Sequence, residues 1–130
     1  MIIVLSLLKK KGEYLMIIKP EACKTELREN MRGGDGTVKI THLVNADALY
    51  DKGRLFGTIT LDKGCSIGYH THETDSEIFY VMSGTAEYND NGETKTVYAG
   101  DVLVCAKGEG HSVKNIGETP VVLTALIVYA

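Results

Sequence analysis

The chain has 130 residues, 44% hydrophobic and 24% charged, which is typical of one globular domain and excludes disordered, collagen-like and coiled-coil proteins. Fourteen basic against seventeen acidic residues give a net charge of −3, so we expect no nucleic-acid partner. The apolar runs at residues 1–8 and 121–130 are shorter than the roughly 20 residues that span a bilayer, so we expect no membrane partner. Three cysteines without CxxC spacing predict a reduced, cytoplasmic protein.

Residues 1–15 differ from the rest and are interpreted as an N-terminal extension, with one domain over residues 16–130. The apolar run 1–8 precedes its lysines, which is the wrong order for a signal peptide. Residues 11–13 can be encoded by a purine-rich stretch resembling a bacterial ribosome-binding site, so we hypothesise that Met16 is the natural start. Alternatively, the apolar run forms a strand that pairs with a sheet edge, for instance of another subunit.

The pattern from Met16 onward is that of short strands, because Val, Ile and Thr outnumber Ala and Leu and glycines punctuate the chain. Asn91-Gly92 predicts a hairpin turn. One short helical turn is predicted from Asn45, as its N-cap, to Gly53. The predicted strands, in chain order, are Thr37–Val44, Leu55–Leu61, Glu77–Ser83, Thr85–Tyr88, Thr94–Tyr98, Asp101–Cys105, His111–Asn115 and Val121–Tyr129.

This many short strands without a long helix predict an all-β sandwich or small barrel. Val121–Tyr129 is apolar on both alternating faces, which predicts protein on each side of it. A homodimer interface would supply the second layer, and a central core strand would give the same pattern. We expect a homodimer.

Three of the four histidines lie in the middle of the chain. His70 and His72 are two residues apart, so both imidazoles leave an extended strand on the same face. Glu77 starts a strand after a short loop, and His111 starts another strand further on. Three imidazoles and one carboxylate converging inside a barrel would bind a divalent transition metal. Surface or hydrogen-bonded core histidines are the alternative, and the fourth, His42, is given no role.

The spacing around these residues resembles the two motifs of the cupin superfamily. The first motif runs Gly, five residues, His-x-His, three or four residues, Glu, six residues and Gly, as in Gly64, His70, His72, Glu77 and Gly84. The second runs Gly, five residues, Pro-x-Gly, two residues, His, three residues and Asn. It is matched by Gly100, Gly108, His111 and Asn115, with Ala106 in place of the proline.

The resemblance implies a single-domain cupin jelly-roll barrel, a double-stranded β-helix, and implies that His70, His72, Glu77 and His111 bind metal. Iron, manganese, nickel, copper and zinc all accept these ligands. Strand alternation predicts that the site is lined by Phe79, Val81, Val113 and Asn115, with simple core packing as the alternative for Val81 and Val113.

Two function classes remain open. The first is a metal-dependent enzyme acting on a small polar, oxygen-containing molecule, since cupins of this size include dioxygenases, isomerases, lyases and decarboxylases. The second is a non-catalytic module that binds or senses a small ligand at the same site. Of the two classes, we expect the metal-dependent enzyme.

Five further features carry expectations of their own. Residues 32–36, Arg-Gly-Gly-Asp-Gly, lack the ending of a phosphate-binding loop and are interpreted as a flexible turn. Cys65 has the wrong strand parity for a metal ligand, and Tyr69 and Tyr80 are expected on outer faces. Glu73 and Asp75 are expected to be solvated, with a general base as the alternative. Arg28, Arg32 and Arg54 are the only arginines, so we expect few clamps for a substrate with several anionic groups.

Overall fold

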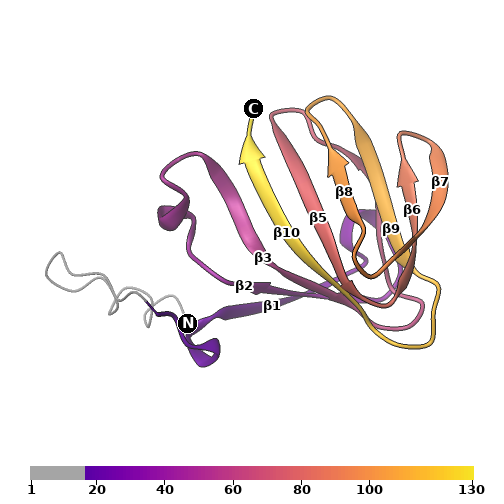
Figure 1. The fold of residues 1–130 in the computed structure, drawn as a ribbon, viewed down its shortest axis with the longest axis horizontal. Helices are drawn as coiled ribbons and strands as arrows, with labels where there is room; N and C mark the ends of the chain where they lie inside the picture. The colour runs from indigo at the N-terminus through magenta and orange to yellow at the C-terminus, as the bar shows by residue number, and fades with distance from the viewer. Residues whose placement is uncertain (1–16) are drawn as a thin grey trace, which may run out of the picture.

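The computed structural model describes residues 17–130, which form two antiparallel β-sheets (Figure 1). The interpretation of residues 1–15 lies outside these described residues. The elements, in chain order, are the 3-10 helix η2 (Pro20–Ala22), β1 (Lys24–Glu29), the 3-10 helix η3 (Met31–Gly33), β2 (Thr37–His42), the 3-10 helix η4 (Ala46–Leu49), β3 (Gly53–Leu61), β4 (Ser66–Thr71), β5 (Asp75–Ser83), β6 (Thr85–Asp90), β7 (Glu93–Tyr98), β8 (Val102–Cys105), β9 (Gly110–Asn115) and β10 (Val121–Tyr129). No helix among them is long and apolar enough to cross a membrane.

The larger sheet has the strand order β1-β2-β3-β10-β5-β8 and the smaller sheet has the order β4-β9-β6-β7. Inward-facing side chains of both sheets form one core, because alternate residues of each strand point to the same side. β3 shows this alternation along its whole length, with every second residue buried. The core includes Phe79, Val81, Leu123 and Val113, none of them more than 2% exposed. The predicted all-β jelly-roll fold is confirmed.

All eight predicted strands are present, with boundaries within two residues of those expected. β10 matches its prediction at both ends and lies between β3 and β5, with one face buried and the other half-buried. The predicted helical turn is a 3-10 helix over Ala46–Leu49, and the side chain of Asn45 makes no capping hydrogen bond.

Strand β1 was not predicted. It lies at the edge of the larger sheet and pairs only with β2, so most of its side chains are exposed on both faces. An edge strand of this kind carries charged residues instead of an apolar alternation, and its sequence, Lys-Thr-Glu-Leu-Arg-Glu, therefore lacks the usual strand signal. The 3-10 helix η3 connects β1 to β2 and packs on β4 of the other sheet.

Candidate metal centre

Four side chains from three strands and one loop converge between the two sheets. His70 on β4 and His111 on β9 are direct cross-strand partners in the smaller sheet. Glu77 lies on β5 of the larger sheet, and His72 follows the last residue of β4. One potential ligand atom from each of these four residues lies within 4.8 Å of the other three, and we call this group the metal cluster. Sequence spacing predicted all four members.

The contacts within the metal cluster join the same nitrogen of each ring. His111 Nε2 lies 3.2 Å from His70 Nε2 and 3.1 Å from His72 Nε2. Glu77 Oε1 lies 3.1 Å from His111 Nε2 and 3.2 Å from His72 Nε2. His72, Glu77 and His111 are all at most 5% exposed. The cluster is therefore a buried group of polar atoms that face one another.

The opposite nitrogen of each histidine is held by the surrounding protein. His70 Nδ1 lies 2.8 Å from the Gly68 carbonyl oxygen, which can only accept a hydrogen bond, so Nδ1 donates. His72 Nδ1 likewise donates to Asp75 Oδ1 at 2.6 Å. In the neutral imidazoles, Nε2 then presents a lone pair to the centre of the cluster. His111 Nδ1 is bonded to the Tyr88 hydroxyl at 2.8 Å.

This donor set fits a metal ion. Lone pairs and a carboxylate that face one another at such short distances repel unless a cation or protons lie between them. Imidazole nitrogens and one carboxylate are ligands for divalent transition metals, and outward hydrogen bonds from Nδ1 are typical of metal-binding histidines. The four residues could therefore hold a divalent ion through three Nε2 atoms and one carboxylate.

The pKa shifts follow from the same contacts. Burial is the largest cause that lowers the pKa of His70, which favours the neutral ligand form. The hydrogen bond to Glu77 raises the pKa of His72, because the carboxylate stabilises the protonated ring. Burial alone would raise the pKa of Glu77, but the hydrogen bonds from His111 and His72 outweigh it and lower that pKa. Glu77 is therefore ionised near neutral pH, as a metal ligand must be.

The loop before β9 holds His72 in place. The His72 N–H donates to the Glu109 carbonyl oxygen at 2.9 Å, and its own carbonyl accepts from the Gly108 N–H at 2.6 Å. Ala106, which replaces the proline of the second motif, donates its N–H to Glu109 Oε1 at 2.8 Å. Proline has no N–H and could not make this bond. The replacement thus exchanges a rigid ring for a hydrogen bond that closes the same turn.

The prediction that Asp75 is solvated was wrong. Asp75 is 4% exposed and bridges His72 and Arg54, whose Nε donates to Asp75 Oδ2 at 2.8 Å. Burial opposes its ionisation, but Arg54 and His72 together lower the pKa of Asp75. Its parity on β5 is the signal that sequence reasoning missed, since residues 75 and 77 of one strand face the same side. Glu73 is exposed, as expected.

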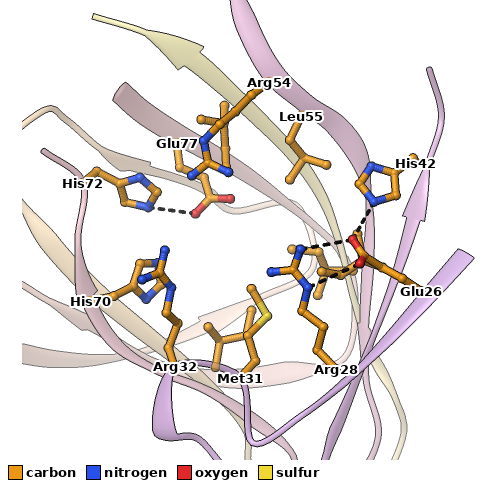
Figure 2. Close-up of a pocket in the computed structure, with 14 residues that line it drawn as sticks. Glu26, Arg28, Met31, Arg32, His42, Arg54, Leu55, His70, His72 and Glu77 are labelled. Carbon is orange, nitrogen blue, oxygen red and sulfur yellow. Dashed lines mark hydrogen bonds and ion pairs between the residues drawn. The ribbon is translucent and has the colours of Figure 1, made fainter. Parts of the chain in front are cut away.

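A cavity of about 160 Å³ opens beside the metal cluster (Figure 2). His70, His72 and Glu77 line one end, and Glu26, Arg28 and His42 line the other. Apolar side chains complete the wall, among them Met31, Ile40, Leu55, Ile59, Ile67 and Ile127. Arg32 and Arg54 also line it, so all three arginines of the chain meet at this cavity. Two of them are already paired with acids, Arg54 with Asp75 and Arg28 with Glu26, so the expectation of few anion clamps stays a prediction.

The four residues predicted to line the site are not among those that line this cavity. Val81 and Val113 are core residues, as the alternative for them predicted. Phe79 stacks on the His111 ring with the centroids 5.3 Å apart. Asn115 is 1% exposed and donates to the carbonyl oxygens of Leu61 and Thr119. All four side chains point inward, as strand alternation predicted. They pack in the core and do not line the cavity.

Two further contacts beside the site were not predicted. Tyr88 is 4% exposed, and burial is the main cause that raises its hydroxyl pKa, so it remains a neutral partner of His111. His42 Nε2 lies 2.7 Å from Glu26 Oε1, which also accepts from Arg28 at 3.2 Å. These contacts cross strands that share no local pattern, and the sequence held no signal for them. Tyr69 and Tyr80 are half-exposed, and Cys65 is outside the metal cluster, as predicted.

The class that this fold and site define is a two-sheet antiparallel β-barrel with an internal candidate metal site of three histidines and one glutamate. The family model described as "Cupin domain" matches residues 57–129, which is more than half of the chain. The chain belongs to the cupin family.

Particular relatives extend the likeness beyond the matched segment. An oxalate-binding protein of Thermotoga maritima is 38% identical over 113 residues, which cover 87% of this chain and 93% of that one. The crystal structure of a predicted oxalate decarboxylase from the same organism superposes with a TM-score of 0.84 at 37% identity, covering 88% of this chain and 100% of that one. A germin-like protein of Arabidopsis thaliana is 45% identical over 62 residues, 42% of this chain and 28% of that protein.

Proposed function

We propose that this protein is a metal-dependent cupin in which His70, His72, Glu77 and His111 bind one divalent transition metal ion. The observation that carries the proposal is the convergence of their four ligand atoms within 4.8 Å of one another. Two of the rings, His70 and His72, must donate their Nδ1 hydrogens outward, which leaves Nε2 free for the ion. The metal is iron, manganese, nickel, copper or zinc, all of which accept these ligands.

The ligand of this metal centre is a small dicarboxylate of the oxalate class. The relative that matches 87% of the chain is named an oxalate-binding protein. The cavity of about 160 Å³ is of a size for a small molecule, and it has three arginines in its wall. When bound, the ion supplies Lewis-acid coordination for carboxylate oxygens. Arginine side chains bind carboxylates through paired N–H donors.

Binding without turnover is supported by the acids of the cavity wall. Among the described residues that line the cavity, Glu77 is a metal ligand and Glu26 is paired with His42 and Arg28. Neither is a free carboxylic acid that could deliver a proton to a reacting carbon. The second candidate is catalysis, decarboxylation of oxalate to formate and carbon dioxide with uptake of one proton. It is favoured by the likeness to the Thermotoga maritima structure that is described as a predicted oxalate decarboxylase.

Metal analysis and ligand titration test the proposal together. Protein purified without chelator or a nickel column is analysed for bound metals, then titrated with oxalate by calorimetry, and formate and oxygen are followed over hours. We expect close to one metal per chain, saturable oxalate binding and no formate. Formate release at a rate that tracks metal content would establish the second candidate. Absence of bound metal, together with no binding of added manganese, iron, nickel, copper or zinc, would refute the metal centre.

Three further expectations from the sequence remain proposals. The protein is a homodimer in the cytoplasm, and residues 16–130 are its barrel domain. Sedimentation analysis at micromolar concentrations would measure the oligomeric state. A monomer would contradict the proposed dimer without affecting the metal centre.

A further inference from the structure

Arg32 is a cation beside the metal cluster without a carboxylate partner among residues 17–130. Arg54 is paired with Asp75, and Arg28 is paired with Glu26. No ion pair joins Arg32 to an acid of the described chain, although its side chain lines the cavity. Figure 2 shows Arg32 rising from the turn toward the end of the cavity where His70 and His72 lie.

The turn that carries Arg32 is fixed against the strand that carries His70. A side chain at Gly68 of β4 would collide with the Arg32 carbonyl oxygen, and one at Gly34 would collide with the backbone of Ser66 and Gly68. Backbone therefore packs directly on backbone at this point, which only glycine allows. The carbonyl of the same Gly68 accepts the hydrogen bond from His70 Nδ1.

The backbone of Arg32 itself has an uncommon conformation. Its φ of 55° lies in the left-handed region, which is unfavourable for a side chain such as arginine. Surrounding packing must hold such a residue in place, and strained residues of this kind cluster at ligand-binding sites. The segment 32–36 is therefore the turn that its glycine-rich sequence predicted, packed against β4, and it positions a guanidinium group.

Counting charges at the cavity shows what is left for a ligand. The pairs Arg54–Asp75 and Arg28–Glu26 each cancel, and His42 shares the carboxylate of Glu26. A divalent ion bound by Glu77 would leave one positive charge, and Arg32 adds a second. An occupant with two negative charges would neutralise both at once.

We propose that Arg32 selects the ligand of this site, by binding the carboxylate of a small dianion whose other oxygens coordinate the metal. This assignment rests on the metal centre and dicarboxylate ligand proposed above. It adds the residue that makes binding depend on the ligand's negative charge. A guanidinium group matches a carboxylate with two parallel N–H donors. The ligand class is thus a small dicarboxylate, and neutral or singly charged metal-binding molecules are disfavoured.

Substitutions at position 32 test the assignment, with oxalate as the probe. Arg32→Gln keeps a long polar side chain and removes the charge, whereas Arg32→Lys keeps the charge. The matched control is Lys39→Ala, which removes one positive charge from the exposed side of β2, opposite to Ile40 at the cavity. Metal affinity, melting temperature and oxalate affinity are measured for all three variants and the parent protein.

We expect Arg32→Gln to bind metal like the parent and oxalate about tenfold or more weakly, the effect of losing one charged hydrogen-bonding partner. Arg32→Lys should recover most of the affinity, and Lys39→Ala should bind oxalate within about twofold of the parent because distant exposed charges are screened. If the role of Arg32 were only to shape the turn, the glutamine and lysine variants would bind oxalate equally weakly.

The outcomes separate this inference from the proposed function. If the parent binds metal and oxalate and Arg32→Gln binds oxalate equally well, the role of Arg32 is refuted and the metal centre stands. If the parent binds oxalate without binding any metal, and Arg32→Gln still weakens that binding, the role of Arg32 in ligand binding is supported and the metal centre is refuted. Equal loss of oxalate binding in Arg32→Gln and Arg32→Lys, at unchanged melting temperature, would also refute selection by charge.

Discussion

Three members of the metal cluster, His70, His72 and Glu77, line the same cavity as the arginine rim, which we define as Glu26, Arg28, Arg32 and His42. The two regions are built differently. The metal cluster comes from β4 and the residue that follows it, β5 and β9, and three of its members are buried. The arginine rim comes from the edge strand β1, its neighbour β2 and the turn between them, and its members are exposed or half-buried. One region is fixed by the core of the barrel, and the other lies where the sheet ends.

The family match divides the cavity in the same way. It covers residues 57–129, which contain the whole metal cluster, whereas every member of the arginine rim, and Arg54 as well, precedes residue 57. The part shared with the family therefore carries the four residues that could hold a metal ion. The segment before it carries the charged side chains at the other end of the cavity, so under the proposed function substitutions there would change ligand preference and leave the metal cluster intact.

Removing a member of the metal cluster should have the largest effect. His111→Ala is expected to weaken metal binding more than about 100-fold, since losing even an outer partner of a metal ligand costs 10–100-fold. His42→Ala, which removes the histidine of the arginine rim, should leave metal affinity within about threefold. Calorimetric titration with manganese or zinc measures both. Equal losses in the two variants would abolish the distinction between the regions.

Asp75 tests how far the metal region extends beyond its ligands. Asp75→Asn should weaken metal binding about 10–100-fold, because the carboxylate orients His72 and keeps its Nδ1 protonated. Glu73→Gln is the control, since Glu73 is an exposed acid in the loop between β4 and β5, two residues before Asp75. If Asp75→Asn and Glu73→Gln bind metal with equal affinity, residues outside the metal cluster do not contribute to metal binding at this position.

Gly68→Ala tests the contact between the two regions. The added methyl group would collide with the Arg32 carbonyl oxygen, so we expect the free energy of unfolding to fall by about 1–3 kcal/mol. Oxalate affinity should fall more than metal affinity, because the turn must move away from β4. At Gly117 the nearest atom to an added methyl is 3.6 Å away, so Gly117→Ala is the matched control in denaturant unfolding. Unchanged stability and oxalate affinity in Gly68→Ala would show that the turn is not docked.

A change of pH should give the most gradual effect. Because Glu77 raises the pKa of His72, a proton must leave this ring when metal binds at a pH below that pKa, and there metal affinity should fall about tenfold per pH unit on acidification. The stability of the metal-free protein should change in the opposite direction and rise on acidification. The raised pKa of His72 contributes stability that is complete below the ordinary value of 6.5 and is lost as pH rises through the folded value.

Melting temperatures from pH 6 to 9, with and without metal, measure both trends. The melting temperature of the metal-free protein should fall with rising pH. The amount by which added metal raises the melting temperature should grow over the same range. The Asp75→Asn protein is the comparison, since it lacks one of the contacts that raise the pKa of His72. Parallel pH curves with and without metal would contradict proton release from His72.

Much of the barrel could be predicted from local pattern. Alternating apolar residues and glycine turns place eight strands, because one face of each contributes to a shared core. β1 could not be predicted, since an edge strand with both faces exposed has no such alternation. The two-residue spacing of His70 and His72, with Glu77 and His111 at motif distances, predicted the metal cluster because strand geometry fixes side-chain direction.

The sequence by itself therefore determined the all-β fold and the four residues of the metal cluster, since both depend on periodicities within single strands. Only the tertiary structure decided that Asp75 is a buried partner of His72 and that three arginines share the cavity. These relations join β1, η3 and β3 to a site on β4, β5 and β9. Register and packing between separate strands create such contacts, and no local pattern of residues encodes them.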